Sequence, residues 1–98
     1  MRTVHLTVEL LIPSHPDYPL IWDWLTACGV DPAWVKMPST VRVLKNAVVT
    51  QEYQHEQDGT LQRRPDDSPV LAEVRYEFTD AEMPVLPELT PGRVTNGA

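Results

Sequence analysis

Residues 17–28 constrain the fold most, because their pattern predicts a short helix with more apolar surface than one sheet can cover. At 100° per residue the apolar side chains span roughly 220° of the circumference, whereas a surface helix carries an apolar stripe of about 100° or a little more. The apolar positions are Tyr18, Leu20, Ile21, Trp22, Trp24, Leu25, Ala27 and Cys28. Trp22 and Trp24 point about 200° apart, so one sheet cannot bury both rings.

Signals at both ends place this helix at about residues 18–28. Asp17 can act as the N-cap, and Pro19 is tolerated in the first turn. Gly29 supplies the residue that commonly ends a helix. Asp31 and Pro32 then repeat the cap-and-proline start, which predicts one more helical turn in which Trp34 covers the end of the helix.

Alternating apolar residues predict the strands. Residues 4–12 form the first strand, with Val4, Leu6, Val8, Leu10 and Ile12 on its buried face. Residues 40–44 and 48–55 form a hairpin around Lys45-Asn46, because Asn accepts a positive φ. One long bulged strand over the same residues is the alternative. Residues 70–78 close the sheet, with the side chains of Val70, Ala72, Val74, Tyr76 and Phe78 pointing inward.

This order is βαβββ, which predicts an α+β fold with one helix packed on a mostly antiparallel sheet of three to four strands. The polar connection 56–69 is expected to be exposed and mobile. Residues 1–80 form the single domain. Residues 81–98 are rich in proline and lack an apolar period, so we expect a flexible C-terminal tail outside the core.

Composition excludes several classes of function. The net charge of −6 argues against nonspecific binding of nucleic acid, because that affinity comes from Lys and Arg. No apolar run approaches the roughly 18–20 residues of a membrane-spanning helix. The first residues lead directly into a strand without the apolar core of a signal peptide. A single cysteine, Cys28, fits a reducing compartment, so we expect a cytoplasmic protein.

The sequence contains no recognisable catalytic, metal or cofactor motif. His5, His15, His55 and Cys28 are the only soft metal ligands, and none stands at a paired ligand spacing. A cysteine within an apolar helical arc has a raised pKa and is a poor nucleophile. We therefore expect a protein that is not an enzyme and that needs no cofactor.

The aromatic residues are the best candidates for a binding site, because Trp and Tyr commonly anchor interfaces. Trp24 shares a sector with Leu20 and Ile21 and is assigned to the core, although the two helix tryptophans could be reversed. The predicted partner-binding residues are Tyr18, Trp22, Leu25 and Trp34. The same residues would also fit a small core filled with large aromatic rings. They would equally fit the interface of a homodimer that binds no other protein.

The dispersed acidic residues allow a further alternative, an acidic mimic of nucleic acid that blocks a nucleic-acid-binding enzyme. An ordinary solvated surface accounts for the same distribution.

The centre of the chain resembles small accessory proteins of actinobacteria and their bacteriophages. The resemblance rests on Gly29-Val30-Asp31-Pro32, Val41-Arg42-Val43, Val48-Val49-Thr50-Gln51-Glu52-Tyr53 and the Asp58-Gly59 loop, and it covers residues 20–80. It implies a phage accessory protein that acts on a host protein in the host cytoplasm. It supplies no catalytic residues.

Overall fold

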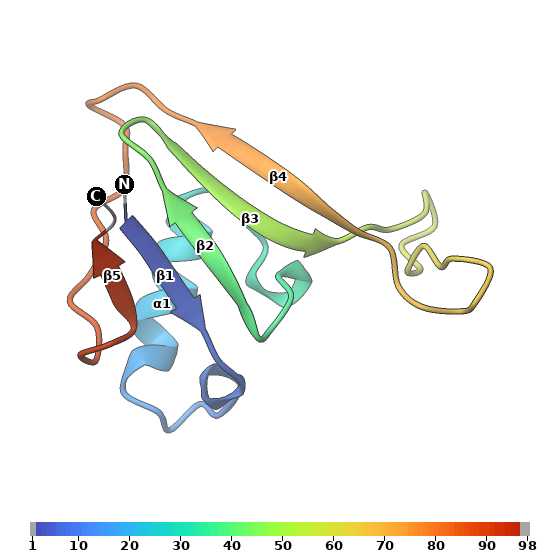
Figure 1. The fold of residues 1–98 in the computed structure, drawn as a ribbon. Coiled ribbons are helices and arrows are strands. Elements are labelled where there is room, and N and C mark those ends of the chain that lie inside the picture. Colours follow the sequence, from blue (N-terminus) through green and yellow to red (C-terminus); the bar gives the residue numbers. More distant parts are fainter. Residues whose placement is uncertain (1, 97–98) are drawn as a thin grey trace.

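The computed structural model describes residues 2–96, which form one antiparallel sheet with one α-helix on one face (Figure 1). The elements are β1 (Arg2–Leu6), the 3₁₀ helix η1 (Val8–Leu11), α1 (Asp17–Ala27), the 3₁₀ helix η2 (Pro32–Trp34), β2 (Ser39–Val43), β3 (Ala47–Tyr53), β4 (Leu71–Glu77) and β5 (Val94–Asn96). The α+β class is therefore as predicted. The strand count is five, so the described order is βαββββ and the expected three- to four-stranded βαβββ arrangement is corrected.

The strands lie in the order β4-β3-β2-β1-β5, and every neighbouring pair is antiparallel. The predicted hairpin is present: β2 pairs with β3, and the Leu44 amide donates to the Ala47 carbonyl at 2.8 Å. Asn46 makes this turn without the positive φ expected of it. The last predicted strand, β4, pairs with β3 as expected.

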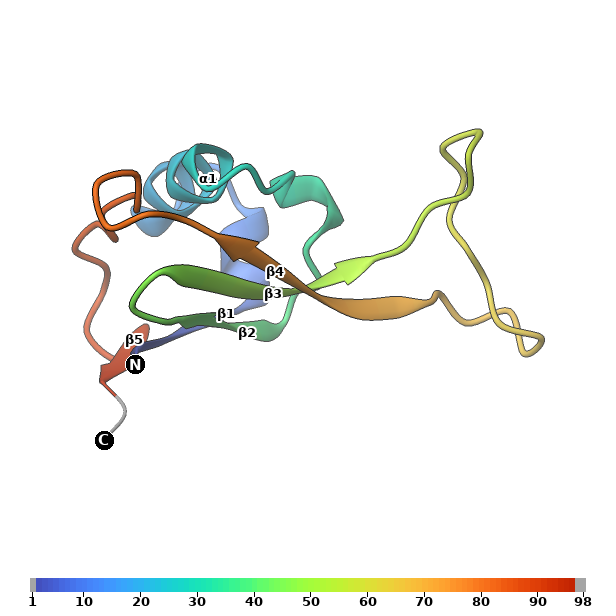
Figure 2. The same cartoon turned by 90° about the horizontal axis from the view of Figure 1, so that it is seen from above.

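Helix α1 covers one face of the sheet (Figure 2), and the main core lies between them. The fully buried side chains there include Val4, Leu6, Leu10, Ile21, Leu25, Val41 and Val48. The helix ends as the sequence indicates: Gly29 has φ 86°, and the Val30 amide returns to the Leu25 carbonyl at 2.9 Å. These two features complete a Schellman motif, which satisfies carbonyls that the helix leaves unpaired.

The first strand is shorter than predicted, because β1 ends at Leu6 rather than Ile12. Its neighbour β2 begins at Ser39, the residue paired with Leu6, so no β2 residue lies opposite the continuation. Beyond that point the Leu10 amide bonds to the Thr7 carbonyl and the chain forms η1. The alternation in residues 7–12 therefore does not describe a strand, and Leu10 alone of these residues is buried.

The expectation that residues 81–98 lie outside the core was wrong for the described part. Val94–Asn96 forms β5 beside β1, Leu86 is buried in the main core, and Arg93 is 7% exposed. The Arg93 guanidinium reaches the Asp17 carboxylate at 3.1 Å. Three prolines and a glycine near Leu86 and Arg93 do not prevent this segment from packing on the core, because the contacts are made by isolated side chains and not by a periodic apolar face.

Residues 54–70 form an arm that projects from the sheet beyond β3 and β4 (Figure 2). It consists of two tight hairpins, with bridges between His55 and Leu61 and between Arg63 and Pro69. At its base, backbone hydrogen bonds connect three residues in a ring: the Gln54 amide donates to the Val70 carbonyl, the Val70 amide to the Gln62 carbonyl, and the Gln62 amide to the Gln54 carbonyl. Residues 56–60 and 63–67 are exposed, as predicted for this connection, and its mobility stays a prediction.

Candidate interaction surface

Two of the predicted partner-binding residues, Tyr18 and Trp22, form an aromatic pair on α1. They lie one helical turn apart, and their ring centroids are 5.1 Å apart with the planes inclined by 31°. Both are half-buried, which leaves part of each ring open to a partner. The Trp22 indole N–H donates to the Leu10 carbonyl at 3.2 Å, and this bond attaches the pair to η1.

Three large aliphatic side chains are exposed on and beside η1. Val8, Leu11 and Ile12 are 58%, 57% and 53% exposed, while Leu10 between them is fully buried and anchors the turn. Together with Tyr18 and Trp22, Val8, Leu11 and Ile12 form what we call the η1–α1 surface. Isolated exposed aliphatic residues are ordinary, whereas several on one short turn are characteristic of interaction sites.

The remaining two predicted residues do not belong to this surface. Leu25 is fully buried in the core, so it has no area to offer a partner. Trp34 is exposed, but it lies in η2 beyond the far end of α1, roughly 14 Å or more from Tyr18 along the helix. Its ring stacks on His55, with centroids 4.0 Å apart. That Trp34 also covers the helix end stays a prediction.

The assignment of the two helix tryptophans is confirmed. Trp24 is 3% exposed and belongs to the core, whereas Trp22 packs only partly against it. Val8, Leu11 and Ile12 were not predicted as surface residues, because alternation placed two of them on the buried face of a strand. One signal was available: Leu10, Leu11 and Ile12 are consecutive apolar residues, which breaks the alternation within the segment that forms η1.

A buried ionic cluster lies beside the η1–α1 surface and fixes the start of α1. The Asp17 carboxylate, which is 2% exposed, accepts bonds from the Thr90 amide at 3.2 Å and from the Arg93 Nε at 3.1 Å. Burial alone would raise the pKa of Asp17, but the bonds from Thr90 and Arg93 outweigh it, so this pKa is lowered. Asp17 therefore joins the C-terminal segment to the helix instead of acting as the predicted N-cap.

Glu9 continues this cluster to the exterior. Its carboxylate lies 3.6 Å from the Arg93 guanidinium and 3.1 Å from His15 Nε2. The Nδ1 of the same histidine accepts the Asp17 backbone N–H at 3.1 Å. Glu9, at the polar border of the η1–α1 surface, is thus bonded both to the residues before α1 and to the C-terminal segment.

A second buried polar group lies under β3 and β4. Glu52 is 4% exposed, and its Oε2 accepts the hydroxyls of Thr50 at 2.5 Å and Tyr76 at 2.7 Å. Desolvation, together with the Glu52 bond and charge, raises the pKa of Tyr76. Because Glu52 Oε2 accepts two hydrogen bonds, the cluster satisfies the buried carboxylate of Glu52.

Cys28 and the potential metal ligands were the remaining candidates for chemistry among residues 2–96. Burial raises the pKa of the Cys28 thiol to about 11, so the nucleophilic thiolate is scarce near neutral pH. Among residues 2–96, no group of three or more His, Cys, Asp or Glu side chains is arranged to hold a metal ion.

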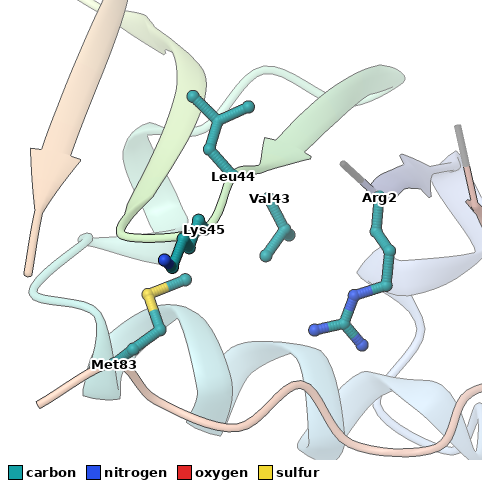
Figure 3. Close-up of a pocket in the computed structure, with 5 residues that line it drawn as sticks. All are labelled: Arg2, Val43, Leu44, Lys45 and Met83. Atoms are coloured by element: carbon teal, nitrogen blue, oxygen red, sulfur yellow. The ribbon is translucent and has the colours of Figure 1, made fainter. Parts of the chain in front are cut away.

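Two cationic side chains line a small pocket between β2 and the C-terminal segment (Figure 3). Its lining side chains are Arg2, Val43, Leu44, Lys45 and Met83. Figure 3 shows Lys45 and Met83 on one side of Val43 and Arg2 on the other. The volume of about 250 Å³ lies below the usual range of roughly 300–1,000 Å³ for small-molecule sites, so this pocket does not define a ligand.

The charged outer face of the sheet does not resemble a row of phosphates. Arg42 pairs with Glu73, and Arg75 Nε contacts Glu77 at 2.9 Å, so cations interrupt the acidic residues there. This arrangement does not favour the acidic-mimic hypothesis, which needs a continuous negative surface.

Comparison with models of known protein families, with curated protein sequences and with solved structures found no match to this chain. Within the part of the chain that the structure describes, no helix has the length and apolar character needed to cross a bilayer. Function is therefore inferred from the surface geometry described above.

Proposed function

We propose that this chain is a nonenzymatic protein–protein interaction module that binds a partner protein through the η1–α1 surface. The observation that carries the proposal is the exposure of Val8, Leu11 and Ile12, each more than half accessible, beside the Tyr18–Trp22 pair. Full burial of a Val, Leu or Ile side chain contributes about 1.5–3 kcal/mol, so three half-exposed ones leave substantial free energy for association.

The surface is also held in one conformation before any partner binds. Leu10 is buried beneath it, the Trp22 indole bonds to the Leu10 carbonyl, and Asp17 is held by Arg93 at the start of α1. A prearranged surface loses little conformational entropy on binding, which favours affinity. A phage accessory protein, the role that the sequence resemblance implies, would meet its partner in the host cytoplasm.

Site-specific photo-crosslinking tests this function. A photoreactive amino acid replaces Leu11 in one version of the full chain and Val85 in a matched control. Val85 is 88% exposed and apolar, and it lies beside Leu20 and Ala27 on the helix side away from Tyr18 and Trp22. The Leu11 probe is expected to give a discrete adduct in host cells, and the Val85 probe is not.

The double substitution Val8→Ser and Ile12→Ser should remove that adduct without unfolding the chain, because both side chains are exposed. Circular dichroism and the denaturation midpoint check the fold. The absence of a Leu11-specific adduct would contradict the proposal. An adduct with the mass of two copies of this chain would instead support the homodimer alternative.

A further inference from the structure

We infer that β4 is a self-complementary edge, at which a second copy of this chain pairs antiparallel about a two-fold axis at Val74. This interface is separate from the η1–α1 surface and would join two sheets into one. The inference rests on three properties of β4: an open edge, the direction of its backbone groups, and the order of its charges.

The two edges of the sheet differ in how they are protected. The edge at β5 is only three residues long. The edge at β4 has seven residues, contains no proline or lysine, and stays in uninterrupted register with β3 from Ala47↔Glu77 to Tyr53↔Leu71. None of the described residues 2–96 runs along the other side of β4 (Figure 1). Long regular edges of this kind are the ones that accept another strand.

The register determines which backbone groups face the open side. The Phe78 amide bonds to the Asn46 carbonyl and the Gln54 amide bonds to the Val70 carbonyl, and both pairs continue the β3–β4 register. Since hydrogen-bonded and non-bonded positions alternate in an antiparallel ladder, the even-numbered residues of β4 bond to β3. The amides and carbonyls that point away from β3 belong to Leu71, Glu73, Arg75 and Glu77.

In one register, all four of these residues pair with the same four residues of a second copy. With the axis at Val74, Glu73 faces Arg75 of the second copy and Leu71 faces Glu77 of the second copy. Four bonded pairs result, each exchanging two backbone bonds, or about eight in total. Moving the axis to residue 73 places Glu73 opposite itself, and moving it to residue 75 places Arg75 opposite itself, so like charges disfavour both alternatives.

The existing ion pairs extend this charge order. Glu73 pairs with Arg42 and Arg75 pairs with Glu77 within one chain, all on the exposed outer face. Across the axis these residues form a row of alternating charge. The row runs from Arg42 and Glu73 of one copy to Arg75 and Glu77 of the second copy. On the opposite face, Ala72, Val74 and Tyr76 are half-buried in the single chain, and pairing would cover more of them.

Complementary charge reversals test the inference by sedimentation equilibrium. Glu73→Arg alone places Arg opposite Arg75, and Arg75→Glu alone places Glu opposite Glu73, so each variant should dimerise about tenfold more weakly than the wild type. Mixing the two variants restores both opposite-charge pairs and should restore dimers of one copy of each. A purely structural effect of either substitution would not be rescued by mixing.

Matched controls distinguish charge contacts between the two copies from the ion pairs within each chain. Arg42→Gln removes the partner of Glu73, and Glu77→Gln removes the partner of Arg75, while neither creates a like-charge contact across the axis. Both controls should dimerise within about threefold of the wild type. A wild type that stays monomeric up to about millimolar concentration, or a dimer unaffected by the reversals, would overturn the inference.

A cysteine at Val74 tests the register directly. Residues at a non-bonded antiparallel pair have Cα atoms about 4.5 Å apart, a separation that a disulfide can span. Val74→Cys should therefore form an intermolecular disulfide under mild oxidation, whereas Ala72→Cys, which faces Tyr76 of the second copy, should not. Native Cys28 is buried and does not compete. Equal crosslinking of both variants would contradict the Val74 axis.

Loss of the dimer at β4 would leave the Leu11 crosslink to a partner protein unchanged. The dimer proposal and the proposed function can therefore fail independently.

Discussion

The two edges of the sheet are built in different ways. At the β5 edge, a three-residue strand is held by buried groups, with the Arg93 guanidinium on Asp17 and Leu86 in the core. At the β4 edge, a seven-residue strand carries exposed ion pairs and leads into a projecting arm. Removing one partner of a buried ion pair costs much more than removing one from an exposed pair. The shorter edge is therefore expected to matter more for stability.

Truncation after Asp80 is expected to have the largest effect. It removes β5, buried Leu86 and Arg93, and with them the backbone amide of Thr90 and the guanidinium that hold the Asp17 carboxylate. The combined loss should exceed about 5 kcal/mol, which is comparable to the whole stability of a small domain. Thermal unfolding followed by circular dichroism should show no cooperative transition or one shifted down by more than about 10 °C. An unchanged midpoint would show that the segment is not needed for the fold.

Arg93→Met isolates the ionic contribution at the same edge. The substitution should lower the free energy of unfolding by about 3–5 kcal/mol, because it leaves Asp17 as an unpaired buried charge. Arg75→Met, the matched change at the other edge, should cost about 0–1 kcal/mol, because its pair with Glu77 is exposed. Urea denaturation measures both. Adding Asp17→Asn to Arg93→Met should recover part of the loss, and equal costs for the two single variants would remove the contrast between the edges.

Acid should loosen the β5 edge through Asp17. Its pKa is lower in the folded chain than the value of about 3.9 in the unfolded chain, so this group stabilises the fold above about pH 4. That contribution is lost as the pH falls through the lowered folded pKa. The groups around it are Arg93, Glu9 and His15. The urea midpoint should fall less steeply with acid in Asp17→Asn than in the wild type; identical slopes would assign the acid sensitivity to other carboxylates.

Shortening the arm should have the smallest effect. Replacing residues 55–69 with a two-residue Asn-Gly turn keeps Gln54 paired with Val70, and so keeps β3 and β4, but removes exposed hairpins that bury little apolar surface. The free energy of unfolding should change by less than about 1 kcal/mol. The denaturation midpoint of the shortened chain, compared with that of the Asp80 truncation, measures this. A loss as large as that caused by the truncation would show that the arm supports the sheet.

Local patterns predicted the elements that depend on local chemistry. The start and end of α1 were placed within about one residue. Asp17 marked the start, although it is not the N-cap, and Gly29 marked the end through its own backbone conformation. The hairpin of β2 and β3 and the inward side of β4 followed from alternation. Alternation also extended β1 too far, because η1 contains apolar residues at even spacing as well and only the absence of a partner strand ends β1.

The candidate site was predicted in part for a related reason. Helical spacing showed that Trp22 and Trp24 face different sides, and Trp24 is the buried one. Helical spacing does not measure the depth of burial, so Leu25, at the edge of the predicted patch, proved to be fully buried. Val8, Leu11 and Ile12 became surface residues only because η1 replaced the expected strand.

The amino-acid sequence alone specified the α+β class, the helix and its ends, the central hairpin and the excess of apolar surface on α1, because each depends on residues close together in the chain. The fifth strand, the burial of Asp17 by Arg93 and the open edge of β4 emerged only from the folded chain. These depend on contacts between distant segments, as between residues 17 and 93. A single buried ion pair or one neighbouring strand leaves no periodic pattern in the sequence.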